Sequence, residues 1–506
     1  MDRPELSAAI IDQLGQLFVS VLKDNAAKLV ESDLDGIEQR LQDMERAVFG
    51  RVVEQTVAVV AATHSGDQPI CMRCHQPMRL IDYKRPRSLQ GLVGDYTIVR
   101  PYFVCDSCHQ GAAPLDEHLG IGAGALSPGL ERVACRLGID DSFEDAADAL
   151  QETLRIGLTD EAIRRVAEGI GQVAEAEAQE AIVLAQGGKE PLPAGASLRC
   201  RRGDQSSDFW RAEVNPASGR SEPADGSAPV LLVETDGAMV HEVDGKWHEV
   251  KSGLVATLGP ETREDKETER TTLVMGKPSY CAGFESAEAF WYRLYVEACR
   301  CGLGSKLVTM IVVLGDGAGW IWHHVPDFLE FDGVEVVEIV DFYHACEHLA
   351  RVAGAVFGEG SAGAKEWLEG LRWSLERKGA GAVLAALAEL TPEGAEATEE
   401  VRKAIGYFTE HAGRMDYPKF IERQLPIGSG AIESACKTLI EEREKGAGMR
   451  WTEQGAQSVA TMRALHKSGR WGTFWKTHPQ RRRPAVFPRK PGQPLLAPAK
   501  SEKLAA

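Results

Sequence analysis

Two apolar runs in this chain each lead directly into the tripeptide Asp-Gly-Ala. The first run begins at Val230 and reaches Asp236, and the second begins at Ile311 and reaches Asp316. Short apolar runs rich in β-branched residues predict buried strands. In a parallel or mixed sheet covered by helices, functional groups collect at the carboxyl ends of the strands. We therefore expect an α/β fold in which, if the two strands are neighbours, the two carboxylates converge.

Converging carboxylates repel one another unless a cation lies between them, and hard oxygen ligands of this kind favour Mg²⁺ or Mn²⁺. Either aspartate alone would equally suit a turn or a helix cap, so it is the repeated context that favours a metal site. A third carboxylate is then expected, and Glu433 is the candidate. It falls in the first turn of a predicted helix that begins after Gly428-Ser429-Gly430. The alternative is that Glu433 only complements the positive end of that helix.

Two Cys-x-x-Cys pairs, CMRC and CDSC, are separated by 30 residues and contribute Cys71, Cys74, Cys105 and Cys108. Two such turns can complete a closed tetrahedral Zn²⁺ site that serves structure and not chemistry. The segment between them alternates in a way that is typical of β-strands, so residues 66–118 are predicted to form a zinc ribbon. The alternative is two unrelated redox-active or buried pairs.

Residues 142–166 predict two short helices around a turn, with Thr159 as the N-cap of the second helix. Arg164 and Arg165 lie near the start of that helix. A DNA-binding helix-turn-helix and a plain helical hairpin both fit this pattern.

The remaining boundaries follow from changes in composition and periodicity. Residues 187–229 are rich in Gly, Pro, Ser and charge, which predicts a linker. The apolar spacing of the N-terminal region predicts helices that either dimerise or pack on the body. The predicted regions are a helical region 1–65, the ribbon 66–118, a helical region 119–186, the linker, an α/β region 230–344, a helical segment 345–425, a second α/β part 426–476 and a basic tail 477–506.

The net charge of −18 is unevenly distributed. From Ser434 onward there are 15 Lys and Arg against 5 Asp and Glu. Such a local excess can hold phosphate even on an acidic protein, although a solvated tail would have the same composition. The 11 cysteines suit a reducing compartment. Since neither a long apolar run nor a secretory signal pattern occurs, the expectation is a cytoplasmic protein without a membrane partner.

Several longer motifs carry a resemblance to a known family. They are ETDGAMV, GDGAGWIW, DFYHACEHL, LPIGSGAIESACK and KGAGMRW, in this order behind the cysteine pairs. Together they resemble bacterial insertion-sequence transposases of the ISKra type, over about residue 68 to Trp475. The resemblance implies a DDE enzyme with an RNase H-like core that is interrupted by an all-α insertion at 345–425. Residues 187–229 are longer and more polar than the family pattern requires.

By this resemblance, Asp236, Asp316 and Glu433 would be the catalytic carboxylates and would hold two Mg²⁺ or Mn²⁺ ions. Asp341 and His344 are similar to an Asp-x-x-His element of related transposases and would support the site. The implied reaction is cleavage at the ends of an insertion sequence and strand transfer into target DNA. The implied partners are the terminal inverted repeats, the target DNA and further copies of the chain, at the bacterial nucleoid.

Lys445, Arg450 and Trp451 lie in the last of these motifs. They would contact phosphate and stack on a base near the catalytic carboxylates, or they would form a cation–aromatic pair at the surface. Two other functions fit the same sequence. One is a DNA-binding regulator derived from a transposase, and the other is a metal-dependent nuclease on the same fold.

Overall fold

The computed structural model describes residues 3–63, 68–186, 230–265, 270–303, 308–331 and 333–481. The predicted linker 187–229 and the predicted tail beyond residue 481 lie outside these ranges. The chain forms two compact units, Met1–Ala167 with Trp471–Ala506, and Glu168–Arg470. None of the helices in these ranges has the length and apolar content needed to cross a membrane.

The first unit begins with a helical hairpin and a small antiparallel sheet. Its elements up to residue 118 are α1 (Arg3–Val30), α2 (Leu34–Thr63), β1 (Arg79–Gly91), β2 (Gly94–Val104), β3 (Gly111–Ala112) and α3 (Pro114–His118). The strand order is β1-β2-β3, and α2 packs against β2. A buried ion pair joins α3 to this sheet, because the Asp116 carboxylate accepts hydrogen bonds of 2.8 and 3.0 Å from the Arg100 guanidinium. Burial of both charges is tolerated because they are paired in this bidentate geometry.

Three helices follow the sheet, and α19 (Trp471–Arg481) also belongs to this unit. They are α4 (Pro128–Asp140), α5 (Phe143–Leu154) and α6 (Asp160–Ala185), of which α6 belongs to this unit only up to Ala167. They share a core of Leu130, Ala134, Ala146, Leu150, Ile156 and Ile163. The Thr159 hydroxyl accepts a hydrogen bond of 3.1 Å from the Ala162 N–H. The predicted N-cap is thereby confirmed, and α5 and α6 are separated by a short turn.

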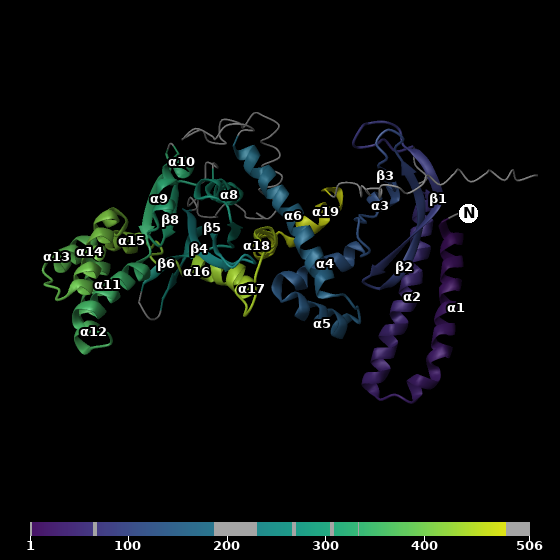
Figure 1. The fold of residues 1–506 in the computed structure, drawn as a ribbon, viewed down its shortest axis with the longest axis horizontal. Helices are drawn as coiled ribbons and strands as arrows, with labels where there is room; N and C mark the ends of the chain where they lie inside the picture. The colour runs from purple at the N-terminus through teal and green to yellow at the C-terminus, as the bar shows by residue number, and fades with distance from the viewer. Residues whose placement is uncertain are drawn as a thin grey trace, which may run out of the picture. The chain divides into compact units, whose positions relative to one another are not determined.

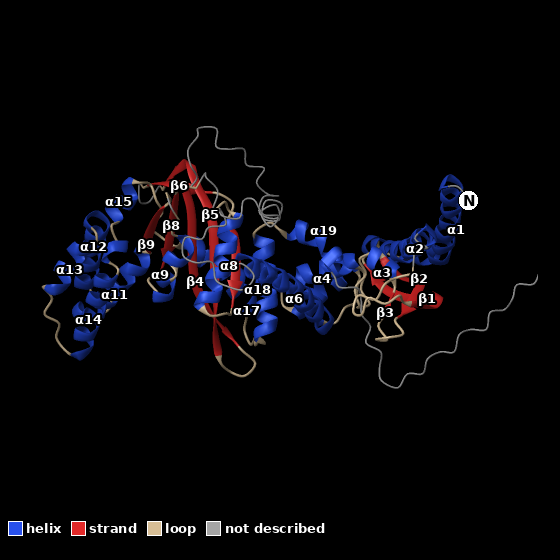
Figure 2. Cartoon of the chain, turned by 90° about the horizontal axis from the view of Figure 1, so that it is seen from above, coloured by secondary structure: helices blue, strands red, loops and turns tan. Residues whose placement is uncertain are grey.

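The second unit is built around one mixed sheet (Figure 2, strands in red). Its strands are β4 (Val230–His241), β5 (Trp247–Glu264), β6 (Thr271–Met275), β7 (Ser279–Gly283), β8 (Met310–Gly315) and β9 (Glu335–Val340). The order is β6-β5-β4-β8-β9, with β7 also pairing with β5. The pairs β4–β8 and β8–β9 are parallel, whereas β5 is antiparallel to its neighbours. The predicted fold class, α/β with a mixed sheet, is therefore confirmed.

One strand boundary differs from the expectation. The sequence predicted a strand that stops at Asp236, but β4 continues to His241. Its pairing with β5 is unbroken from Val230 opposite Leu258 to His241 opposite Trp247. This long hairpin carries the strand through Asp236, because every backbone group on that side keeps its partner in β5.

The helices of the second unit cover the sheet or follow it. They are α8 (Ala287–Arg300), α9 (Gly319–His323), α10 (Val325–Leu329), α11 (Phe342–Phe357), α12 (Ala362–Lys378), α13 (Ala380–Ala388), α14 (Ala395–Glu410), η2 (Ala412–Arg414), α15 (Tyr417–Glu422), α16 (Gly430–Cys436), the π-helix η3 (Lys437–Glu441), α17 (Glu442–Glu444) and α18 (Glu453–Lys467). Helix α8 packs on β5 and β7 through side chains that include the buried Phe290, Trp291 and Leu294. Residues 342–422 contain only helices and their connections, and α11 to α14 gather in one bundle (Figure 1).

Candidate functional site

Asp236 and Asp316 are carried by two neighbouring strands of the sheet. Strands β4 and β8 are parallel neighbours, and their register places Glu234 opposite Leu314. Each aspartate comes two residues after this pair, Asp236 within β4 and Asp316 directly after the end of β8. Glu433 joins them from α16, which packs on β4 and β5. The three carboxylates that were predicted from sequence lie near enough for the charges of Asp316 and Glu433 to act on Asp236.

The charges of these carboxylates act on one another. Burial raises the pKa of Asp236 above its usual range, and the negative charges of Asp316 and Glu433 raise it further. Hydrogen bonds from the Gly237 N–H and the Cys436 thiol act in the opposite direction. Among the residues that the structure describes, no Lys or Arg forms an ion pair with any of the three carboxylates. Within the described part of the chain, no ion pair with Lys or Arg therefore offsets the repulsion between them.

The two Asp-Gly-Ala tripeptides have different conformations. Asp236 stands inside β4, and its carboxylate accepts a hydrogen bond of 2.7 Å from the next N–H, that of Gly237. Asp316 stands just after β8, and its carboxylate accepts a hydrogen bond of 2.8 Å from the Ala318 N–H. Gly317 has φ of +101°, a conformation that side chains rarely adopt. The same three residues therefore hold one carboxylate on a strand and the other in a turn.

The helical bundle reaches the site through Tyr407. Its hydroxyl donates a hydrogen bond of 3.1 Å to the backbone carbonyl of Asp316, and its ring stacks on His348 with 3.8 Å between the centroids. A Cβ on Gly317 would lie 2.8 Å from the Tyr407 ring. Tyr407 therefore fixes the turn that holds Asp316. The predicted supporting residue His344 is half-exposed, with its ring centroid 6.3 Å from that of Tyr407.

The helix that carries Glu433 is held by buried carboxylates. The Glu234 carboxylate accepts a hydrogen bond of 2.9 Å from the Ile432 N–H. The predicted supporting residue Asp341 accepts one from the Ser429 N–H, and another of 2.7 Å from the His344 N–H at the start of α11. Sequence reasoning missed Glu234, although a glutamate inside an apolar strand run was a visible signal.

Burial raises the pKa of Glu234 to about 8. The hydrogen bond from the Ile432 N–H lowers it, while the negative charges of Asp341 and Glu433 raise it. Glu234 therefore belongs electrostatically to the same group as the catalytic candidates. It differs from them in being almost completely enclosed.

The carboxylate set fits hard divalent cations in its chemistry, since it offers oxygen ligands and an uncompensated negative charge. It is less compact than a closed metal site. Within the described ranges, Asp236, Asp316 and Glu433 are not among the groups whose ligand atoms all lie within 4.8 Å of one another. A set that holds two ions about 4 Å apart need not converge on one point. Strand, turn and helix thus frame an open site.

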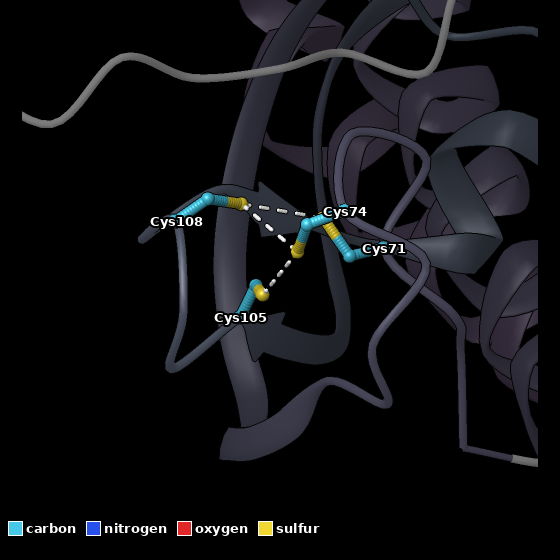
Figure 3. A group of neighbouring side chains, drawn as sticks. All are labelled: Cys71, Cys74, Cys105 and Cys108. Carbon is cyan, nitrogen blue, oxygen red and sulfur yellow. Dashed lines mark hydrogen bonds between the residues drawn. The ribbon is translucent and has the colours of Figure 1, made fainter.

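The four predicted zinc ligands form a compact cluster in the first unit (Figure 3). The Sγ–Sγ distances are 3.4 Å for Cys71–Cys108, 3.3 Å for Cys74–Cys105 and 3.7 Å for Cys74–Cys108. All four Sγ atoms lie within 4.8 Å of one another, so the cluster can hold a structural metal ion, and four thiolates are consistent with zinc.

The two cysteine turns are copies of one structure. The Cys71 N–H donates to the Gln76 carbonyl at 2.8 Å, and the Cys105 N–H donates to the Gln110 carbonyl at the same distance. The histidine after each pair has positive φ, 55° at His75 and 57° at His109. Both turns read Cys-x-x-Cys-His-Gln, a repeat that the sequence reasoning did not use. Neither histidine belongs to the cluster.

The thiols of the cluster differ in acidity. Backbone N–H donors, first that of Cys74, lower the pKa of Cys71 to about 6. The pKa of Cys105 is lowered in the same way by the Cys108 N–H, whereas a hydrogen bond with Cys105 raises the pKa of Cys74 to about 12. Two turns that each favour a thiolate suit a metal ion, which binds cysteine in the deprotonated form.

A second group that can hold a metal ion was not predicted from sequence. It consists of Glu242, His248 and Glu453 in the second unit. The His248 Nδ1 lies 3.2 Å from a Glu242 oxygen and 3.9 Å from a Glu453 oxygen. Glu453 is exposed and His248 is half-buried, and surface groups of this kind are also stable as simple ion pairs.

The predicted DNA-binding residues of the first unit are paired with an acid. Arg164 and Arg165 form ion pairs with Glu161, at 2.7 and 2.8 Å. The Arg165 side chain is 72% exposed, so its guanidinium remains accessible to phosphate. The structure places both arginines in the first turns of α6, as the sequence predicted.

The predicted DNA-binding residues of the second unit divide into two groups. Arg450 is exposed, and Lys445 pairs with Glu441 at 2.6 Å. Trp451 is only 6% exposed, and its indole N–H donates to the Glu444 carbonyl at 3.2 Å. The guanidinium over its ring, at 4.8 Å from the centroid, is that of the buried Arg443. In this conformation the Trp451 ring packs in the interior and presents no face to a base.

Comparison of the chain with models of protein families and with curated proteins gave no match. Function is therefore inferred from the geometry of the carboxylates and from the motifs that carry the resemblance.

Proposed function

We propose that this protein is a DDE transposase that cleaves DNA at the ends of an insertion sequence and joins those ends to target DNA. The observation that carries the proposal is that the adjacent parallel strands β4 and β8 carry Asp236 and Asp316, the second directly after the end of its strand, while Glu433 lies on the helix that packs on β4. The negative charges of Asp316 and Glu433 both act on Asp236. The strand order β6-β5-β4-β8-β9 supports an RNase H-like core. Helices α11 to α15, between β9 and α16, support the all-α insertion of the resemblance.

The three carboxylates would hold two Mg²⁺ or Mn²⁺ ions, which would activate the attacking water or 3′-hydroxyl and stabilise the leaving oxygen. The residues of the chain contribute position and charge. Asp236 is fixed by the β4–β5 ladder, and Asp316 by its turn and by Tyr407. Because their negative charges lack an ion-paired Lys or Arg among the described residues, the site favours a cation. Rigid placement of ligands is the main requirement of phosphoryl transfer.

The DNA would be held by Lys and Arg side chains outside the carboxylate site. Arg450 and Lys445 remain proposed phosphate contacts in the second unit, and Arg164 and Arg165 in the first. Trp451 is not proposed as a stacking residue, because its ring is buried. Since both ends of an element must be cut together, we propose that the protein acts as an oligomer at the nucleoid.

The test uses the DNA that flanks the gene on both sides, incubated with the protein and Mg²⁺ or Mn²⁺. Wild type is compared with Glu433→Gln, and zinc content is measured in both. We expect wild type to cut and join the ends, and the variant to bind them without cutting. If both proteins bind the DNA and neither cuts it, the proposal is wrong and the protein is better explained as a DNA-binding regulator. If the wild-type protein cuts the DNA but does not join the ends, the protein is better explained as a metal-dependent nuclease.

A further inference from the structure

Two buried carboxylates lie beneath the start of α16. Glu234, on β4, is 1% exposed, and Asp341, directly after β9, is completely buried. Each accepts a hydrogen bond from a backbone N–H at the entry to the helix, Glu234 from Ile432 and Asp341 from Ser429. Burial of a carboxylate is unfavourable unless such donors satisfy it. These two acids therefore have a defined structural partner, which is the helix that carries Glu433.

Helix α16 has no hydrogen bond from its own N-cap side chain. The first N–H groups of a helix have no partner within the helix and are commonly bonded by the N-cap side chain. Ser429 occupies the N-cap position of α16 but makes no side-chain cap hydrogen bond. Its hydroxyl donates instead to the Glu433 carboxylate, at 3.1 Å. The sheet thus caps α16, and the serine is left free to contact Glu433.

The other end of α16 is also fastened. It continues directly into the π-helix η3. Arg463 of α18 is 3% exposed and donates to the carbonyls of Thr438 and Leu439, the latter at 2.9 Å. Since α16 is held at its start and η3, which continues it, is held by Arg463, the position of Glu433 along the sheet depends on these anchors.

We propose that Glu234 is a positioning residue that sets the distance between Glu433 and Asp236. Glu234 and Asp236 lie two residues apart on β4 and therefore point to the same face of the sheet. The N–H that Glu234 holds belongs to Ile432, the residue directly before Glu433. One side chain thus links the strand of the first carboxylate to the helix of the third. This inference rests on the proposed function, because it takes Glu433 as a ligand of the catalytic ions.

The test compares two substitutions at one position. Glu234→Gln keeps an oxygen that can accept from the Ile432 N–H, and Glu234→Leu removes it. The matched control is Glu338→Leu on β9, a half-buried glutamate that pairs with Arg414 away from α16. Cleavage of flanking DNA is measured over a range of Mn²⁺ concentrations, together with DNA binding and hydrogen exchange of the Ile432 amide.

We expect Glu234→Leu to lower cleavage by roughly 10- to 100-fold, because a small displacement of a ligand has effects of this size. Half-maximal cleavage should need a higher Mn²⁺ concentration, the Ile432 amide should exchange faster, and DNA binding should stay unchanged. Glu234→Gln and Glu338→Leu should resemble wild type in all of these measurements.

Three results would overturn the inference. Glu234→Leu with the Mn²⁺ dependence of wild type would show that Glu234 does not position Glu433. Glu234→Gln and Glu234→Leu with equal losses and unshifted Mn²⁺ dependence would reduce Glu234 to a general contributor to stability. A wild-type protein that cuts no DNA would overturn the proposed function itself, and the positioning role with it.

Discussion

The four-cysteine cluster and the carboxylate site both gather groups of like charge, but they do so by different means. The cysteine cluster consists of two turns of six residues that have the same structure. The carboxylates come from a strand, a turn and a helix, and Asp236 precedes Asp316 by 80 residues (316 − 236) in the sequence. The first site is determined by local geometry, and the second by the topology of a sheet.

The two sites also differ in how far their side chains are exposed to solvent. Each cysteine sulfur has another sulfur within 3.3 to 3.4 Å, which leaves room for one enclosed ion. Of the carboxylates, Asp236 and Asp316 are half-buried and Glu433 is exposed. A closed site suits a structural role, whereas an open one has room for a substrate. The following predictions test this contrast, beginning with the largest expected effect.

Cys105→Ser should abolish metal binding at the cluster and unfold the sheet β1-β2-β3. Metal binding contributes on the order of 10 kcal/mol in small modules of this kind, which is more than a small sheet can replace. Zinc content and hydrogen exchange of the strands measure the loss. Ser107→Ala, an exposed position in the same turn, is the control and should retain one zinc. Full zinc content in Cys105→Ser would contradict a four-cysteine site.

Asp316→Asn should lower DNA cleavage by roughly 100- to 1000-fold, since one ligand of the proposed ions loses its charge. Zinc content should be unchanged, because the cysteine cluster lies in the other unit. DNA binding should also be unchanged, because Asp316 is not one of the proposed phosphate contacts. Cleavage rates on flanking DNA measure the effect. The control is Asp327→Asn, an exposed acid on α10. Equal activity of the two variants would remove Asp316 from the catalytic group.

Gly317→Ala should destabilise the second unit by about 1–3 kcal/mol, the range for a residue forced into an unfavourable backbone conformation. The positive φ and the contact with Tyr407 both oppose a side chain here. Urea unfolding measures the change in free energy. Gly370→Ala in α12, where a Cβ meets open space, should instead be neutral or stabilising. Equal stability of the two variants would mean that the turn is not rigid.

The smallest expected effect concerns pH. Burial lowers the pKa of His348 to about 4, whereas an unfolded histidine titrates near pH 6.5. Between these values the unfolded chain binds a proton that the folded chain does not, so this part of the stability is present above pH 6.5 and is lost as the pH falls. His348→Phe keeps the ring on Tyr407 and should lose stability less steeply between pH 6.5 and 4. Identical slopes of Tm against pH in the two proteins would contradict this.

Local features of the sequence predicted local structure well. The cysteine pairs, the Thr159 cap and the strand that ends before Asp316 all depend on neighbours within a few residues, and the structure confirms them. The convergence of the two aspartates was predicted only on the condition that their strands are neighbours, which β4 and β8 are.

Features that depend on distant pairing were not predicted. β4 passes through Asp236 because β5 pairs with its whole length. Trp451 is buried because its backbone bonds to His241 and Val243, more than 200 residues earlier (451 − 243 = 208). The partner of Glu234 is Ile432, which only the folded sheet brings near. Sequence patterns identified the reactive groups but not the residues that hold them.

The most direct test of the carboxylate site is a crystal structure with Mn²⁺ located by its anomalous scattering. We predict anomalous peaks between Asp236 and Asp316, with Glu433 within reach, and the loss of these peaks in Asp236→Asn. The group Glu242, His248 and Glu453 provides an internal comparison, since it also can hold a metal ion. Peaks there or at the surface, with none between the two aspartates, would contradict a catalytic metal site built on β4 and β8.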